Sequence, residues 1–261
     1  MVYMRLLLTG FQDSLQYRGR LLIDMFVGFL PVAIEIVLWT AIYAAGNYAV
    51  IGGYSYSDMC IYLAMAMLVG SIMQSANVAR PVANDIKEGS LSRFVLKPIG
   101  SLRYYLCTSV SECLIFLIIV FVPITVLLYV FVIKHSVWIY VVALFSLTLS
   151  YLLMYLFNYM IGMIAFWLVS ITSFFSMKNA IVGFLAGSIL PISFFPDSFQ
   201  MVSRYLPFQY MVFAPIDAFI TGEMSSILGG ICVQAVWIGL LAALCKVMWQ
   251  RGLKRYSAVG N

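Results

Sequence analysis

Hydrophobic residues in this chain run in long uninterrupted stretches instead of alternating with polar ones. A helix needs about 20 apolar residues to cross a bilayer, and stretches of this kind predict six transmembrane helices. They lie at residues 21–45, 58–78 and 114–133, within 137–169, within 180–195, and at 228–249. Because each run is far longer than a buried strand requires, the pattern predicts an all-α polytopic membrane protein with a single transmembrane domain.

Four further segments of the chain do not fit a spanning helix. In residues 1–20 an apolar stripe faces a polar one, which is typical of a helix lying in the membrane interface. Residues 79–105 form a polar loop between the second and third spans, and a short break is expected at 170–179. Residues 196–226 are aromatic but carry three prolines, which exclude one continuous helix and predict short broken helices that dip partly into one leaflet.

The polar loop contains signals for two short helices. Asp85 and Glu88 have the spacing of an N-cap residue and its reciprocal acid, which predicts a helix that begins at Asp85. Gly89 should end that helix, and Ser90 can cap a second one. A proline at position 98 ends the second helix in turn, because the residue before proline avoids helical geometry.

The second short helix would carry apolar side chains on one face and cations beside them. Leu91, Phe94 and Val95 have the spacing that places them together. Lys87 precedes this apolar group, and Arg93 lies between Leu91 and Phe94. Two interpretations remain open from the residues alone: a surface that docks another protein, or a charged loop that only sets orientation.

Composition supports the membrane assignment and narrows the function. Hydrophobic residues make up 64% of the 261 residues and charged residues only 10%, against about 25% charged in soluble domains. In such a chain the net charge of +5 indicates orientation and attraction to anionic lipid, and no nucleic-acid partner is expected. The five cysteines show no C-x-x-C pairing, so small buried apolar roles are favoured over disulfides or metal ligation.

The distribution of cations predicts the orientation. If the N-terminus is cytoplasmic, all but Lys134 and Arg204 of the fifteen Lys and Arg fall in segments on the inner side. This count includes Lys178, which the predicted break at 170–179 places in an inner loop. By the positive-inside rule, both termini and the loop 79–105 should be cytoplasmic, and the segment 196–226 should face outward.

Catalytic motifs are missing from the sequence. There is no G-x-x-x-x-G-K-[ST] loop to bind nucleotide phosphates and no G-x-S-x-G elbow. The single histidine, His135, excludes H-E-x-x-H and other multi-histidine zinc sites. The chain is therefore not expected to be an enzyme or to bind a cofactor itself.

The order of these features resembles the membrane subunits of type-two ABC exporters, whose fold is also called type V. The resemblance covers essentially the whole chain: an interfacial helix, six spans, a cytoplasmic loop and a proline-rich outer stretch before the last span. In the loop, Glu88, Gly89, Leu91 and Pro98 match the family's acid, glycine, leucine and proline. The basic ending, residues 251–256, is similar to a subgroup that works with a second permease and a separate ATPase.

This resemblance implies a division of labour between subunits. The loop would be a coupling helix that lies in a groove of a cytoplasmic ABC ATPase. Two copies of this ATPase would be present, and they would bind the ATP and Mg²⁺. Its contacts would come from Asp85, Lys87, Glu88, Gly89, Leu91, Arg93, Phe94 and Val95. A second permease, identical or homologous, would complete the path, the outer broken helices would help close the exit, and the complex would export its substrate across the bacterial plasma membrane.

Two acids in or beside the spans are candidate polar sites. Glu35 lies near the middle of the first span, and Glu112 lies one turn before the third. Glu35 could form part of a proton or substrate route, or be a protonated carboxyl group that ties two helices together. Glu112 could instead pair with nearby cations. The alternative function is a proton-coupled secondary transporter that uses both acids, although a single acid near midplane makes a sparse relay.

Overall fold

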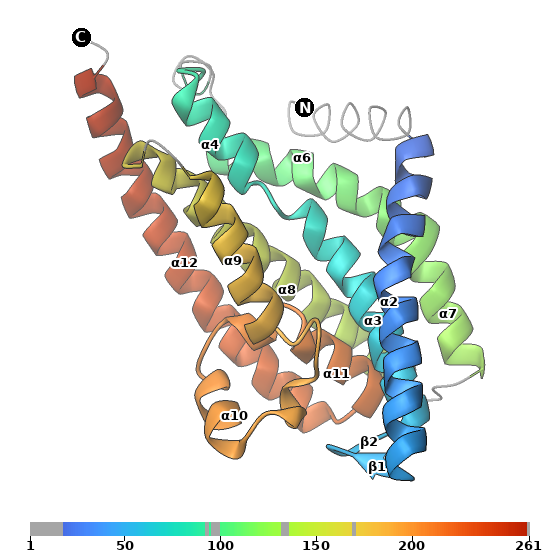
Figure 1. The fold of residues 1–261 in the computed structure, drawn as a ribbon. Helices are drawn as coiled ribbons and strands as arrows, with labels where there is room; N and C mark the ends of the chain where they lie inside the picture. The colour runs from blue at the N-terminus through green and yellow to red at the C-terminus, as the bar shows by residue number, and fades with distance from the viewer. Residues whose placement is uncertain (1–17, 92–93, 95–99, 132–135, 169–170, 260–261) are drawn as a thin grey trace.

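The computed structural model describes residues 18–91, 94, 100–131, 136–168 and 171–259, which form a bundle of helices (Figure 1). Five helical stretches of this part are long and apolar enough to cross a membrane, and they include the first four predicted spans and the last. The protein is therefore an all-α, multi-pass membrane protein. The interfacial helix predicted for residues 1–20 falls outside the described residues except for its last three.

The first two long helices are joined by a small hairpin. Helix α2 (Arg18–Gly46) leads into strands β1 (Val50–Ile51) and β2 (Tyr54–Ser55), which pair antiparallel. Helix α3 (Tyr56–Ser75) begins at once, because the Ser55 hydroxyl accepts from the Asp58 backbone while the Asp58 carboxylate accepts from the Ser55 backbone. This reciprocal cap starts the second span two residues before its predicted beginning.

Helix α4 (Ala79–Lys87) follows α3, and helix α6 (Ser101–Phe116) begins the third span. A π-helical turn, η1 (Leu117–Phe121), connects α6 to α7 (Val122–Phe131). It ends two residues before Pro123, which has no N–H to donate, and widened turns of this kind are a common cause of helix bends. The third span is thus a bent, composite helix.

The fourth and fifth spans differ from their predictions. Helix α8 (Val137–Met163) ends in a 3-10 turn, η2 (Ile164–Phe166), within the predicted range. Helix α9 (Thr172–Leu185), however, occupies almost all of the predicted break at 170–179, and the predicted span at 180–195 is wrong in its second half. A lone lysine suggested a loop at that point, but this lysine of α9 is buried against polar partners on α8 and on the connection between α3 and α4.

The segment before the last helix is broken as predicted. It contains the 3-10 turn η3 (Ile192–Phe194), helix α10 (Asp197–Ser203), the 3-10 turn η4 (Phe208–Tyr210) and helix α11 (Phe213–Thr221). Prolines stand in the residues immediately before α10 and η4 and in the first turn of α11, the positions where a missing N–H does least harm. Helix α12 (Met224–Val259) then runs the full length of the bundle.

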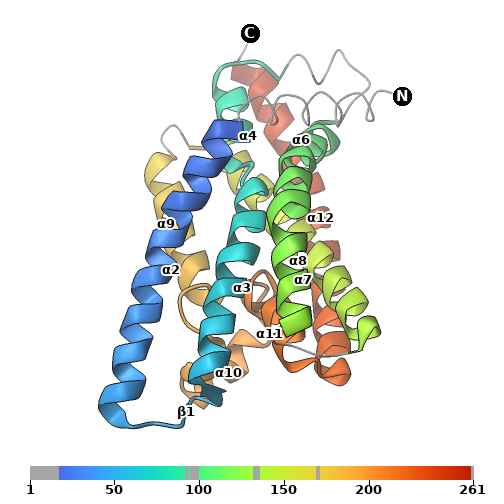
Figure 2. The same cartoon turned by 90° about the vertical axis from the view of Figure 1, so that its right-hand side faces the viewer.

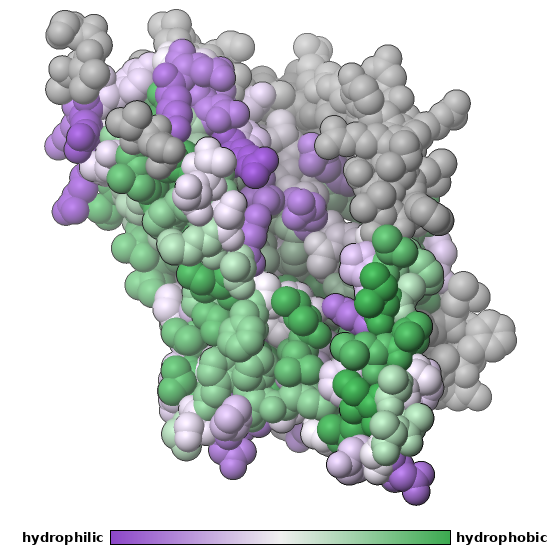
Figure 3. Space-filling model, in the orientation of Figure 1, coloured by the Kyte–Doolittle hydropathy of each residue, from purple (hydrophilic) through white to green (hydrophobic). Residues whose placement is uncertain are grey.

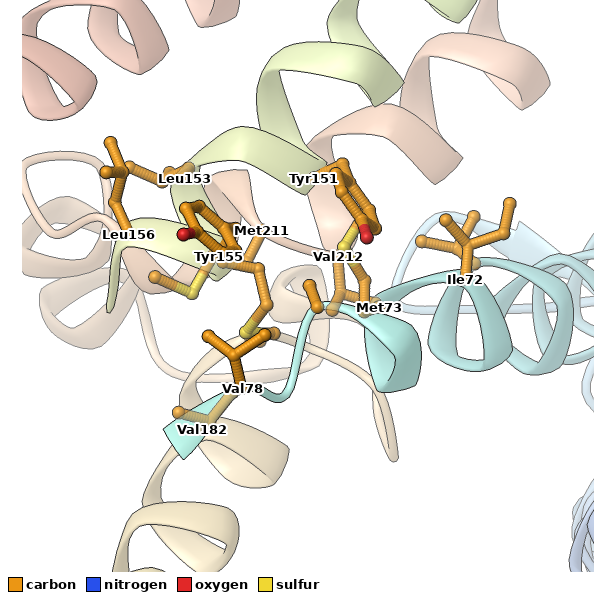
Figure 4. Close-up of a cluster of buried hydrophobic side chains, with 14 of the residues drawn as sticks. Ile72, Met73, Val78, Tyr151, Leu153, Tyr155, Leu156, Val182, Met211 and Val212 are labelled. Atoms are coloured by element: carbon orange, nitrogen blue, oxygen red, sulfur yellow. The ribbon is translucent and has the colours of Figure 1, made fainter. Parts of the chain in front are cut away.

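The bundle is organised around α8. Helices α12, α4 and α11 all pack against it, while α2 contacts mainly α3. The core includes residues from α3, α8, α9 and the η4–α11 connection (Figure 4). Three of the four methionines of the second span, Met59, Met65 and Met73, are also buried, so they serve as packing residues.

The two ends of the bundle are built differently. Helix α4 and the C-terminal end of α12 lie together at one end, here called the α4 end (Figures 1 and 2). The hairpin, α10 and α11 lie at the other, here called the broken-helix end. Each end contains a candidate site.

Candidate functional site

Helix α4 is fastened to α8 by close packing. Its buried face consists of Ala79, Val82, Ala83 and Ile86. Gly162 on α8 makes the approach possible, because a Cβ at that position would lie 2.7 Å from both the Ala79 carbonyl oxygen and the Val82 Cβ. No side-chain hydrogen bond caps the first turn of α4. The start of this helix is therefore set by the packing of its apolar face on α8.

Beyond α4, polar contacts tie the chain to the third span. Gly89 has a φ of +75°, a left-handed conformation that glycine adopts without strain and that ends the helix. The Ser90 hydroxyl donates back to an Asp85 carboxylate oxygen over 2.9 Å. The other carboxylate oxygen of Asp85 accepts a hydrogen bond from the hydroxyl of Tyr105 on α6. Asp85 therefore links the end of α4 to the beginning of the third span.

This geometry corrects the predicted start of the first short helix. Asp85 was expected at the N-cap and Glu88 three residues inside the helix, but α4 begins at Ala79 and ends at Lys87. Ser90, which was predicted to cap the second short helix, donates a hydrogen bond from its hydroxyl back to the Asp85 carboxylate. The helix starts earlier than predicted because the apolar face that α8 covers extends back to Ala79, and such packing outweighs local capping signals.

The expectation that Leu91 and Phe94 fill a partner's cleft does not fit their positions in this chain. Leu91 is 1% exposed and lies in the main core. The half-buried Phe94 ring packs against the rings of Tyr104 and Tyr105, with centroids 5.3 Å and 5.7 Å away. Apolar residues in a short loop bury themselves in the nearest available core, which here is the chain's own. Arg93 and Val95 lie outside the described residues.

The exposed face of the α4 end is polar. Its exposed residues are Arg80, Pro81, Asn84, Lys87, Glu88 and Gly89. Basic residues near the end of α12 lie at the same end of the bundle, namely Arg251, Lys254 and Arg255. Gly252 allows α12 to pass close to η2, since a Cβ there would lie 2.3 Å from the Phe166 ring. The α4 end is therefore a charged surface over a closely packed interior.

The broken-helix end contains a cavity. It has a volume of about 580 Å³ and is enclosed by η3, α10, η4 and α11 together with α8 and α12. Among its polar lining residues are Ser193, Gln200, Arg204, Gln209 and Asp217. Burial raises the pKa of Asp217 to about 6, and the nearby Glu223 carboxylate acts in the same direction. The cavity can hold a polar group.

A buried amide anchors the wall of this cavity. Gln234 on α12 has no exposed surface, and its amide nitrogen donates to the Ser150 hydroxyl over 2.8 Å and to the Tyr210 carbonyl over 3.1 Å. The Ser146 hydroxyl on α8 donates to the Gln234 side-chain oxygen over 3.3 Å. This network joins η4 to both long helices, and the sequence offered no local signal for it because the partners lie 24 to 88 positions away.

Glu35 and Glu112 do not form a joint site. Glu35 is half-buried on α2, and Glu112 is exposed on α6. Helix α3 packs against both α2 and α6 and lies between them (Figure 2). Glu35 has no hydrogen-bond partner among the described residues, so the predicted helix tie is not seen in that part of the chain.

Sequence reasoning missed a third polar site, which surrounds Lys178 on α9. This lysine was expected in a cytoplasmic loop, but it is only 7% exposed and lies in the second turn of a helix. Its ammonium group donates to the side-chain oxygens of Asn158 over 2.7 Å and of Asn77 over 3.3 Å. Within the described ranges, no cluster of His, Cys, Asp and Glu is suited to hold a metal ion.

Comparison with known families identifies the chain. The model of a family described as ABC-2 family transporter protein matches residues 29–260. The chain belongs to this ABC-2 family. It is an ABC transporter permease, a membrane component and not itself an ATPase, as the resemblance in its loop and outer stretch predicted. No curated protein matches the chain.

Proposed function

We propose that this ABC-2 permease is the membrane subunit of an ATP-driven exporter in the bacterial plasma membrane. Two copies of a cytoplasmic ATPase would supply the energy and bind the ATP and Mg²⁺, and a second permease, identical or homologous, would complete the transport path. The chain would cross the membrane six times, with α9 as the short fifth crossing and both termini in the cytoplasm. The family match supports the class of transporter, and the charge distribution supports the orientation.

The attachment of α4 is the observation that carries the proposal. Membrane helices satisfy their own backbone groups, so a cytoplasmic motor can move them only through an element fixed to their ends. Helix α4 meets this need, because it packs on α8 at Gly162 and reaches α6 through the Asp85–Tyr105 hydrogen bond. A force applied to α4 would thus reach the third and fourth spans directly.

The ATPase would contact the exposed polar face of α4 and the turn after it. This face contains Asn84, Lys87, Glu88 and Gly89, of which the last three were predicted as contacts. Leu91 is better suited to holding the turn in place, since it is buried in this chain's core. At the other end, the cavity behind α10 and α11 gives these broken helices room to rearrange and open an exit.

The test compares one substitution at the two ends of the bundle. Glu88 and Glu223 are both exposed, the first at the α4 end and the second at the broken-helix end. We expect Glu88→Lys to lower the amount of ATPase that co-purifies with the permease several-fold, because a reversed charge in a contact surface weakens association. Glu223→Lys should leave co-purification unchanged. Equal recovery of the ATPase with both variants would contradict docking at α4.

A further inference from the structure

The polar site around Lys178 borders a cavity of its own, which is open on one side. The cavity has a volume of about 260 Å³, well above the roughly 10–15 Å³ that a cavity needs to hold one water. It lies at the junction of α3, α4 and α9. Its lining is polar apart from one ring: Gln74, Asn77, Arg80, Phe175, Lys178 and Asn179. Its three amide side chains and two cations can bind a polar ligand through hydrogen bonds.

The cavity contains two positive charges and no carboxylate among its lining residues. Lys178 bonds only to neutral amide oxygens, which leaves one of its three N–H groups without a recorded partner in the described part of the chain. Arg80 lies close enough to act on Lys178 electrostatically. A buried cation is costly unless an opposite charge neutralises it, so this arrangement favours an anionic ligand.

The arrangement of donors suits a phosphate group. The Arg80 guanidinium lies over the Phe175 ring, 5.9 Å from its centroid, which holds it beside the cavity. A guanidinium can donate two parallel hydrogen bonds to a phosphate, and an ammonium adds a point charge. The side-chain oxygen of Asn77 accepts from Lys178, so its amide N–H groups can donate to the same anion.

The cavity lies toward the α4 end of the bundle, between α3, α4 and α9. Hydrophilic surface gathers over the α4 end of the molecule and extends down beside α9 to the apolar surface (Figure 3). Lipid headgroups occupy such a boundary, and basic pockets between membrane helices on the cytoplasmic side bind anionic ones. The lipid source is therefore favoured over a free anion.

We propose that Arg80 and Lys178 form a binding site for the phosphate of an anionic membrane lipid, at the junction of α3, α4 and α9. The site rests on the proposed placement of the α4 end at the cytoplasmic face of the membrane, and it is independent of ATPase docking. Helix α4 already packs on α8. Since Arg80 belongs to α4 and Lys178 to α9, a bound lipid would connect α4 to α9 as well.

The experiment measures lipid binding to the purified full-length permease in detergent. The probes are phosphatidylglycerol, diacylglycerol with the same acyl chains but no phosphate, and inorganic phosphate as a competitor. The variants are Arg80→Gln, Lys178→Gln and the double variant, and Lys246→Gln serves as the control because Lys246 is an exposed cation on α12. The melting temperature of each variant shows whether it is folded, and Arg80→Gln replaces an exposed side chain and removes its contact with the Phe175 ring.

We expect phosphatidylglycerol to bind at least about tenfold more tightly than diacylglycerol. Each site variant should bind phosphatidylglycerol about tenfold more weakly than the wild type, the equivalent of ~1.4 kcal/mol. Lys246→Gln should bind like the wild type. Equal binding by the site variants and the control would overturn the proposal, because general attraction to basic residues would then explain it. Millimolar phosphate that displaces the lipid completely would also overturn it, in favour of a free anion site.

Discussion

The α4–α8 contact and the broken-helix end of this permease differ in how closely their parts are packed. At the α4 end, a Cβ on Gly162 would lie 2.7 Å from the neighbouring helix. At the broken-helix end, a Cβ on Gly230 would lie 3.8 Å from its nearest neighbour, beside a cavity of about 580 Å³. Closely packed interiors transmit displacement, whereas a hollow region can rearrange. The contrast fits an input of force at α4 and a movable barrier at α10 and α11.

The largest expected effect tests the close packing itself. Gly162→Ala should destabilise the protein by about 3 kcal/mol, because the methyl group must push α4 away from α8. Gly230→Ala makes the same chemical change where there is space, and should cost less than about 0.5 kcal/mol. Thermal unfolding of both variants in detergent would check this, and similar losses for the two would remove the contrast between the ends.

A smaller effect is expected where the broken-helix end is anchored. Gln234→Leu removes the amide that joins η4 to α8 and α12 and leaves buried polar groups unpaired, which should cost about 2 kcal/mol. Gln250→Leu, on an exposed position of the same helix, is the matched control. Unfolding midpoints measure the difference. Equal stability of the two variants would show that the cavity wall does not depend on this network.

The smallest effect concerns the link between α4 and the third span. Tyr105→Phe removes only the hydroxyl that donates to Asp85, and should lower stability by about 1 kcal/mol. Tyr205→Phe, at a position 78% exposed in the broken-helix end, should change nothing measurable. If the link also carries force, Tyr105→Phe should lower transport relative to ATP hydrolysis in the reconstituted complex. Unchanged coupling would restrict the link to a structural role.

Much of the fold could be predicted from the sequence because it depends on local burial in a bilayer. Long apolar runs identified the first four spans and the last, since a lipid-embedded backbone must form helices. The prolines of the segment 196–226 predicted its broken helices for a similarly local reason. The predicted family was confirmed by the family match over residues 29–260.

The tertiary structure decided the roles of residues whose contacts lie far away in the sequence. Leu91 has the pattern of a docking residue, and only its burial in the core assigns it to internal packing. Lys178 resembled a loop residue because a charge is costly inside the bilayer, so a lone lysine in an apolar run suggests a break between two spans. Its acceptor Asn77 lies 101 positions away, and no local pattern could reveal that pairing. The sequence determined the membrane class through side-chain hydrophobicity, and helix packing determined which polar residues face water and which meet one another.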